Sequence, residues 1–312
     1  HPARLVVHRP GNAESEPALM DPSPDSMNQD ELPPPRTRDV DELREIARQL
    51  RVSTLRMIHR ARSGHTGSSL SCADIVACLY FGEMRYYPFR PDWQGRDRLV
   101  LSKGHAAPVL YAALARAGYI TRGDTERLRE LSSILQGHPD SRRCPGVEAS
   151  TGSLGQGLSI AHGMALALRN APSKPRVYAL LGDGELQEGQ VWEAAMSAAH
   201  YGSANLCAIV DNNGLQIDGP VERIMGVEPV VDKFASFGWN SLPIDGHDIS
   251  AILDGLDRAK ACTDRPTALI ASTVKGKGVS RFENKVEWHG KAPSDDDLAL
   301  ALSELGEEAE GS

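Results

Sequence analysis

Two short apolar runs near the middle of the chain, each followed at once by polar turn residues, leave few folds open to it. The runs are 177–181 and 206–210, and they end in Gly-Asp-Gly and Asp-Asn-Asn respectively. Between them, the spacing of apolar residues over 190–201 predicts a helix. Strand, turn, helix and strand in this order indicate a βαβ unit, whose parallel strands end at the same edge of a sheet. The segment 176–219 therefore predicts a ligand site at that edge.

The polar residues after these two strands offer oxygen ligands. Asp183 lies in the first turn and Asn213 in the second, and twenty-seven residues separate Gly184 from Asn212. A carboxylate and an amide oxygen suit Mg²⁺ or Ca²⁺ rather than zinc. Mg²⁺ usually has few protein ligands and completes its shell with water and substrate phosphates, and glycine amides in the turn can meet phosphate groups. The pattern favours a metal-bridged diphosphate, although an ordinary βαβ turn capped by Asp and Asn contains the same residues.

Three further junctions each carry a histidine directly after a glycine. His65 and His138 lie in turns, and His105 follows a predicted strand over 97–102. Loops at strand ends are where binding and catalytic sites are commonly built. One turn histidine alone would carry little weight, but three in the same context indicate a single site.

The rest of the chain alternates helical and strand patterns. The first helix is expected over 41–62 and is expected to stop at Gly64, which fits a left-handed C′ position. Further helices are predicted over 72–81, 107–117, 158–168, 234–239, 248–260 and 296–305, and further strands over 242–244 and 267–273. This alternation predicts the α/β class, with a mostly parallel sheet and helices on both faces.

Composition divides the chain into three parts. Residues 1–37 are rich in Pro, Ser and acidic side chains and are expected to form a disordered or extended arm, with Met20 and Met27 as candidate native start residues. Residues 38–293 are expected to form one α/β domain. Residues 294–312 are expected to form an acidic surface helix and tail.

The glycine-rich segment 148–157 precedes a predicted helix. Its glycines do not follow the G-x-G-x-x-G spacing, and no strand pattern comes before them, which argues against a dinucleotide loop. A loop whose backbone contacts a flat ring is the better interpretation.

Charge and hydropathy argue against some classes of partner. The formal net charge is -8, which suggests no basic surface for nucleic acid. No apolar run approaches the roughly 20 residues that a membrane helix needs, and the first residues do not form a signal peptide, so a cytoplasmic location is expected. The five cysteines lack C-x-x-C pairs and predict reduced thiols in the core.

Seven segments together resemble the N-terminal, diphosphate-binding half of transketolases, which has the thiamine-diphosphate-binding fold. The resemblance runs from about Leu43 to Pro293 and rests on the order and spacing of SGHTGSSLS, LSKGHAAPVLYAAL, LQGHPD, STGSLGQGLS, GDGELQEGQVWEA, DNNGLQIDG and VKGKGVSRFENKVEWHGKAP. One departure is Thr66, where the family often has proline. The combination is far more specific than any one of the segments.

The resemblance implies roles for individual residues. The implied metal ligands are Asp183, Asn213 and the carbonyl of Leu215. The implied contacts to thiamine diphosphate are Ser68, His105, Gly152, Ser153, Leu154, Gly184, Asn213, Lys275 and His289. The implied catalytic residues are His65, His105, His138 and His289 around the sugar and the reacting carbon, and Glu188 in a network between paired active sites. Neutral imidazoles near their reference pKa of about 6.5 would suit the proton transfers.

The activity implied is transfer of a two-carbon ketol unit from a ketose phosphate, such as xylulose 5-phosphate, to an aldose phosphate in the pentose phosphate pathway. A complete transketolase has a second half that activates the aminopyrimidine, stacks on it and binds substrate phosphate. No segment of the 312 residues resembles this second half. The chain is therefore expected to act only with a second chain that supplies this half, in an α2β2 heterotetramer.

Three alternatives stay open at this point. The chain could be the decarboxylating subunit of a 2-oxo acid dehydrogenase complex, although the SGH, KGH and WHGKAP segments favour a transketolase. It could be a non-catalytic subunit that has kept the fold. It could also belong to a split transketolase-like enzyme for an unusual sugar.

Overall fold

The computed structural model describes residues 36–307, all of which belong to the larger of two units, Pro33–Ser312. Nearly all of the predicted N-terminal arm, 1–37, lies outside these residues, as does the end of the predicted tail. The division into 1–37, 38–293 and 294–312 therefore stays a prediction.

A five-stranded parallel sheet forms the centre of the described unit and confirms the predicted fold class. The strand order is β1-β2-β3-β7-β6. In the register, Gly182 lies beside Asp211, and Asn212 lies beside Ser272, so neighbouring strands end at the same level. The strands are β1 (Arg98–Leu101), β2 (Val177–Gly182), β3 (Leu206–Asn212), β6 (Asn240–Asp245) and β7 (Thr267–Ser272).

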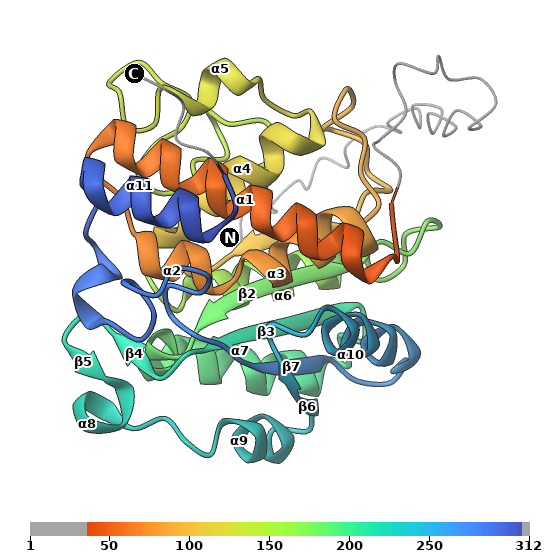
Figure 1. The fold of residues 1–312 in the computed structure, drawn as a ribbon. Helices are drawn as coiled ribbons and strands as arrows, with labels where there is room; N and C mark the ends of the chain where they lie inside the picture. The colour runs from red at the N-terminus through yellow and green to blue at the C-terminus, as the bar shows by residue number, and fades with distance from the viewer. Residues whose placement is uncertain (1–35, 308–312) are drawn as a thin grey trace, which may run out of the picture. The chain divides into compact units, whose positions relative to one another are not determined.

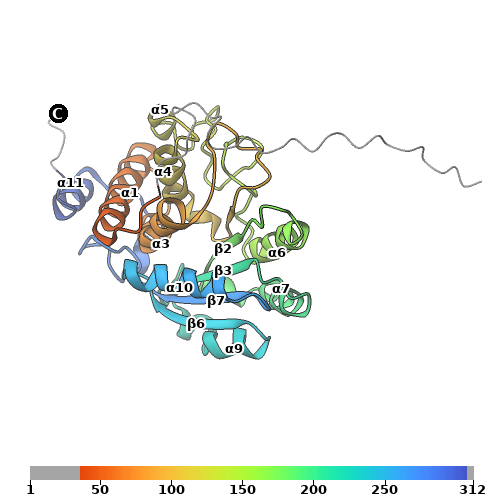
Figure 2. The same cartoon turned by 90° about the vertical axis from the view of Figure 1, so that its right-hand side faces the viewer.

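Helices cover both faces of this sheet (Figures 1 and 2). Alternate strand residues point to opposite faces, so Tyr178 and Leu180 join one apolar cluster while Ala179 and Leu181 join another. The first cluster lies under α1 (Val40–Ala61), α3 (Ala73–Ala77), α4 (Ala107–Ala117) and α10 (Ile249–Ala261). The second lies under α6 (Gln156–Leu168), α7 (Gly189–His200) and α9 (Val230–Ser236).

A third apolar cluster lies beside the sheet, between α1, α2 (Thr66–Ser71) and α11 (Asp295–Glu304). Phe282 and Trp288 are its largest members, with ring centres 3.9 Å apart. Leu302 and Leu305 complete it from the C-terminal side. The cluster fixes the loop that leads to His289. The remaining short elements are η3 (Cys78–Glu83), η4 (Gly104–Ala106), α5 (Arg122–Thr125), η5 (Gly184–Gln187), β4 (Leu215–Gln216), β5 (Gly219–Pro220), α8 (Val221–Met225) and η6 (Val286–His289).

The start of the chain's helical layer differs from the prediction in two ways. The first helix ends at Ala61, and the left-handed residue that caps it is Arg62 (φ 49°) rather than Gly64. The next helix begins at Thr66 instead of Cys72, is interrupted at Cys72, and finishes as a π-helical turn over Cys78–Glu83. Small and hydroxyl residues over 66–71 gave this segment the composition of a turn, and tertiary packing overrides that local preference.

The cysteine prediction is confirmed for four residues of the five. All five thiols are free, and Cys72, Cys78, Cys144 and Cys207 are buried. Cys262 is only half-buried, because it caps the end of α10 instead of lying in the core. Among the described helices, none is both long and apolar enough to cross a membrane.

Helix α6 offers a matched pair of glycines for testing how tightly it packs on the sheet. A Cβ at Gly157 would lie 2.3 Å from Ser102 Oγ, whereas one at Gly163 would meet nothing within 4 Å. Gly157→Ala should destabilise the chain by about 1–3 kcal/mol through overpacking. Gly163→Ala should leave it unchanged or stabilise it by up to about 1 kcal/mol through helix propensity. Urea unfolding measures both, and equal effects would contradict the packing seen here.

Candidate functional site

The carboxyl ends of β2 and β3 bring the predicted metal ligands to one edge of the sheet. Asp183 follows β2 and is buried, with 3% of its surface exposed. Its carboxylate accepts hydrogen bonds from the backbone N–H groups of Gly184 (2.7 Å) and Gly214. Burial, and then the negative charge of Asp211, raise the pKa of Asp183 to about 6. A divalent cation would favour the charged form of this carboxylate.

Asn213 and Leu215 lie across from Asp183, on the segment after β3. Asn213 Oδ1 accepts a hydrogen bond from the Leu215 N–H (3.1 Å), and the Leu215 carbonyl accepts one from Lys275 Nζ (2.9 Å). Each oxygen keeps a second lone pair for a metal. Burial, and then the positive charge of Lys103, lower the pKa of Lys275 to about 8.

Several features of this edge fit a metal-bound diphosphate. Ser68 is 1% exposed and its Oγ has no hydrogen-bond partner within the described residues, so it is available to bind a ligand. Lys275 supplies a buried positive charge, and Asp183, Asn213 and Leu215 supply only oxygen ligands, as Mg²⁺ requires. Over residues 36–307, no cluster of three or more His, Cys, Asp or Glu could hold a metal by itself.

The four predicted histidines gather in one cluster, although they come from four separate segments. The ring centre of His65 lies 5.3 Å from that of His105, 6.2 Å from His138 and 5.6 Å from His289. His105 and His289 are stacked, with centres 5.1 Å apart. The Nδ1 atoms of His65 and His289 are buried without a hydrogen-bond partner in the described chain. These two nitrogens are free to bind a ligand.

The expectation that these imidazoles titrate near pH 6.5 is wrong for the chain as it stands. Burial, reinforced by neighbouring positive charges, lowers the pKa of His65 to about 4 and that of His289 to about 3. The pKa of His105 falls well below its usual value for the same reasons, and burial and then Arg129 lower that of His138. All four are therefore neutral at pH 7 and can accept protons or share hydrogen bonds.

This depression of the histidine pKa values predicts how stability depends on pH. Below pH of about 6.5 the histidines of the unfolded chain gain protons while His65, His105 and His289 of the folded chain stay neutral, so the free energy of unfolding should decrease from pH 7 to pH 5. His289→Gln should reduce this decrease, and His200→Gln, at an exposed histidine on α7, should not. Urea midpoints at the two pH values measure it. The same pH dependence in all three proteins would contradict the cluster's role.

The glycine-rich loop 148–157 passes between two of the histidine segments. Thr151 Oγ1 donates to the Leu101 carbonyl (2.7 Å), and a Cβ at Gly104 would lie 2.8 Å from the Gly152 nitrogen. Gly152 has a φ of 138°, and a Cβ there would lie 3.0 Å from the His138 ring. The backbone at Gly152, Ser153 and Leu154 is thus held near the histidine cluster, where it was predicted to contact a flat ring.

Two glutamates in the turn after β2 have opposite environments. Glu188, the predicted one, is exposed, and its carboxylate has no hydrogen-bond or ion-pair partner within the described chain. Glu185, which the sequence analysis did not select, is 2% exposed and accepts hydrogen bonds from Gly155 N–H (2.9 Å), Gly182 N–H (3.0 Å) and the Ser102 hydroxyl. Glu185 ties the glycine-rich loop to the ends of β1 and β2.

A buried ion pair beneath the site was also missed. Lys103 Nζ donates to Asp211 Oδ2, and the two side chains are 1% and 0% exposed. Burial alone would lower the pKa of Lys103 and raise that of Asp211, but their mutual attraction reverses both shifts. A charge directly after an apolar strand is the signal that could have identified Asp211.

Comparison with known proteins agrees with this arrangement. Residues 43–312 match the family described as transketolase, thiamine diphosphate binding domain. The chain is 42% identical to the 6-deoxy-6-sulfo-D-fructose transketolase subunit of Clostridium sp. (strain MSTE9), over 86% of this chain and 97% of that protein. It is 40% identical to an apulose-4-phosphate transketolase subunit of Phocaeicola vulgatus, over 81% of this chain and 90% of that protein.

This chain covers a smaller share of a transketolase of known structure. Transketolase from Campylobacter jejuni subsp. jejuni NCTC 11168 matches with a TM-score of 0.83 and 35% identity, over 88% of this chain but 44% of that chain. The chain thus spans nearly all of two relatives that are named as subunits and less than half of this transketolase chain.

Proposed function

Because this chain belongs to the transketolase family and matches its thiamine diphosphate binding domain, we propose that it is the N-terminal subunit of a two-chain transketolase. The reaction is transfer of a two-carbon ketol unit from a ketose phosphate to an aldose phosphate. Support for a second chain comes from the two relatives that are named as subunits and are covered over 97% and 90% of their length.

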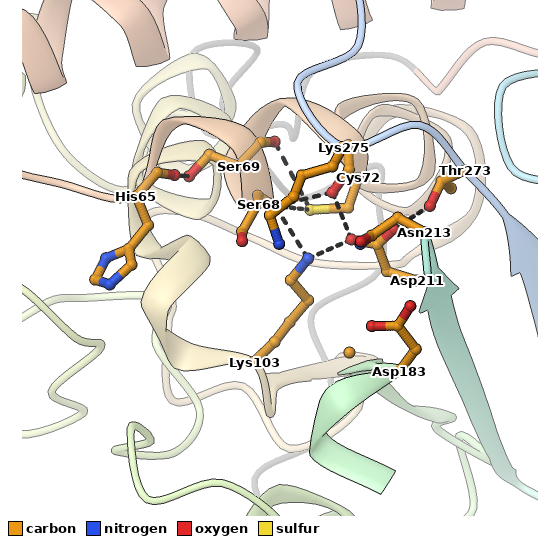
Figure 3. A network of polar contacts seen from close by, with 12 residues as sticks. His65, Ser68, Ser69, Cys72, Lys103, Asp183, Asp211, Asn213, Thr273 and Lys275 are labelled. Atoms are coloured by element: carbon orange, nitrogen blue, oxygen red, sulfur yellow. Dashed lines mark hydrogen bonds and ion pairs between the residues drawn. The ribbon is translucent and has the colours of Figure 1, made fainter. Parts of the chain in front are cut away.

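One observation carries the proposal: three buried polar atoms that have no hydrogen-bond partner among residues 36–307 lie near the same edge of the sheet. They are Ser68 Oγ, His65 Nδ1 and His289 Nδ1. Figure 3 shows Ser68 close to Lys275 and Lys103, with His65 farther along the same edge. A diphosphate on the Ser68 side and a sugar on the histidine side would satisfy both groups.

The cofactor's thiazolium ring supplies the electron sink for cleavage of the sugar when it is bound. In this chain, Asp183, Asn213 and the Leu215 carbonyl would hold Mg²⁺ or Ca²⁺. Lys275, Ser68 and the Gly184 amide, which donates to Asp183 in this structure, would hold the diphosphate. The backbone over 152–154 would contact the aminopyrimidine.

The histidines orient the sugar and move its protons. His65, His138 and His289 hold hydroxyl groups, and His105 and His289 lie toward the reacting carbon. Their lowered pKa values keep the imidazoles neutral at pH 7, so each has an unprotonated nitrogen that can accept a hydrogen bond from a hydroxyl group. The positive charges of Lys103 and Lys275 help to maintain this neutrality.

The partner chain supplies the rest of the active site. Glu188 is exposed and its carboxylate is unpaired within the described residues, which suits a group that pairs across an interface. An α2β2 heterotetramer, with two copies of each chain, would place two such sites in one molecule. The pentose phosphate pathway is the setting we propose first.

Ketol transfer measured with and without the partner chain tests this function. The assay contains thiamine diphosphate, Mg²⁺, xylulose 5-phosphate and ribose 5-phosphate, with pyruvate as the alternative donor. We expect activity only with both chains and only from the sugar. Activity of this chain in rigorous isolation would disprove the two-chain assignment, and pyruvate decarboxylation would favour the dehydrogenase alternative.

The donor sugar has a second candidate class. Two relatives are named for 6-deoxy-6-sulfo-D-fructose and apulose 4-phosphate. These sugars form the second arm of the assay. Preference for either over xylulose 5-phosphate would assign the chain to a specialised sugar pathway while leaving ketol transfer in place.

A further inference from the structure

The buried pair Lys103–Asp211 makes no cofactor contact in the function proposed above, yet it lies among the proposed ligands Ser68, Lys275 and Asp183 (Figure 3). Lys103 Nζ donates to Asp211 Oδ2 and to the Ser68 carbonyl (3.0 Å). The second contact fixes the backbone of the residue whose hydroxyl lacks a partner in the described chain.

Asp211 collects donors from three separate segments. Besides Lys103, which follows β1, it accepts hydrogen bonds from Ser71 Oγ on α2 and from Thr273 Oγ1, which follows β7. Together with its own position on β3, the carboxylate therefore connects four segments that are distant in sequence.

Each of these segments also carries a proposed cofactor ligand, two or three residues away in the sequence. His105 lies two residues after Lys103, Asn213 two after Asp211, and Lys275 two after Thr273. Ser68 lies three residues before Ser71, on the same helix. The contacts to the pair thus link four segments, each of which carries one of the proposed ligands.

Stability alone does not account for a pair of this kind. Removing two charges from water costs as much as, or more than, their attraction returns, and an apolar pair of similar size is often equally stable. We propose that Lys103 and Asp211 are positioning residues for thiamine diphosphate, holding Ser68, His105, Asn213 and Lys275 in the relative arrangement that binds the metal-bound diphosphate. This inference rests on the proposed function.

A matched pair of threonine variants tests the proposal without leaving a charge unpaired. Thr273→Val removes a hydroxyl that donates to Asp211, whereas Thr54→Val removes a buried hydroxyl that has no partner in the described chain. We measure binding of thiamine diphosphate to the full chain in Mg²⁺ by isothermal titration calorimetry, with the partner chain present, and Tm in parallel. Thr273→Val should weaken binding by about tenfold or more, as expected for a lost hydrogen bond to a charged group. Thr54→Val should leave it unchanged.

A second matched pair tests the ion pair itself. Lys103→Met breaks it, and Arg85→Met breaks another pair, with the buried Asp97 at the opposite end of β1. Both variants should lower Tm. Only Lys103→Met should also weaken thiamine diphosphate binding, by more than about thirtyfold, since it leaves a buried carboxylate unpaired at the site.

The outcomes separate the two proposals. Wild-type affinity for thiamine diphosphate in Thr273→Val overturns the positioning role. This test holds even if Lys103→Met does not fold. The positioning role is also overturned if Lys103→Met and Arg85→Met lose the same cofactor affinity for a given decrease in Tm. That result would indicate that the Lys103–Asp211 pair only stabilises the fold. Wild-type chains that bind no thiamine diphosphate overturn the proposed function and the inference together.

Discussion

Asp183→Ala is expected to weaken Mg²⁺-dependent binding of thiamine diphosphate by at least about a hundredfold. Replacing a group that only supports a metal ligand already costs about 10–100-fold in metal affinity, and Asp183 is the one carboxylate proposed to bind the metal directly. It is buried and fixed by the N–H groups of Gly184 and Gly214. Calorimetric titration of the chain, with and without Mg²⁺, measures the loss.

The matched control is Asp218→Ala, at an exposed aspartate in the neighbouring β4–β5 turn. It should bind the cofactor like the wild type. The pKa of Asp183, raised to about 6, adds a second test. Metal affinity should fall as the pH decreases below about 6, because the protonated carboxyl is a poor ligand. Equal affinities for the two alanine variants would refute the assignment of Asp183.

His289→Ala is expected to lower kcat of the two-chain enzyme by at least about a hundredfold, the usual minimum for losing a general acid or base. Its Nδ1 is buried and unpaired within the described chain, and its ring stacks on that of His105. Cofactor affinity should change less, because the proposed metal ligand Asp183 and the proposed diphosphate ligand Lys275 are unchanged. Steady-state kinetics with saturating thiamine diphosphate separate the two effects.

His200→Ala is the control for this variant, since His200 is exposed on α7 and its ring contacts only Tyr201 among the described aromatic pairs. It should retain wild-type kcat. A His289→Ala enzyme with wild-type kcat would remove His289 from the mechanism. A loss confined to the apparent KM for the cofactor would make it a binding residue only.

Much of the fold was predictable because its signals are local. The runs that form β2 and β3 are apolar without interruption, as strands buried on both faces must be, and glycine marks the turn after β2. Four histidines gather because their segments end at one edge or pack on it. These local patterns do not predict which polar side chains become buried. Glu185 and Glu188 occupy one turn, and only the packing of the glycine-rich loop against Ser102 decides which of them is enclosed.

Ion pairs between residues far apart in the chain could not be predicted from the sequence either. Lys103 and Asp211 are 108 residues apart, and each alone resembles an ordinary charge in a loop. The lowered histidine pKa values have the same origin, because the cations and apolar groups responsible come from other segments. The π-helical turn over Cys78–Glu83 has no signal in the sequence that we can identify, although its residues are all buried.

The parallel order β1-β2-β3-β7-β6 has a consequence for folding. Residues from Ser68 to His289 contribute to one edge, so the proposed cofactor site exists only after strands far apart in sequence have paired, which is intrinsically slow. A ligand that recognises this edge binds the native state and not the unfolded chain. At about a hundredfold excess over its Kd it would add about 2.7 kcal/mol to the free energy of unfolding. Thiamine diphosphate would then stabilise only chains in which all of these strands have paired. Its concentration in the cell would therefore affect how much of the chain is lost to proteolysis.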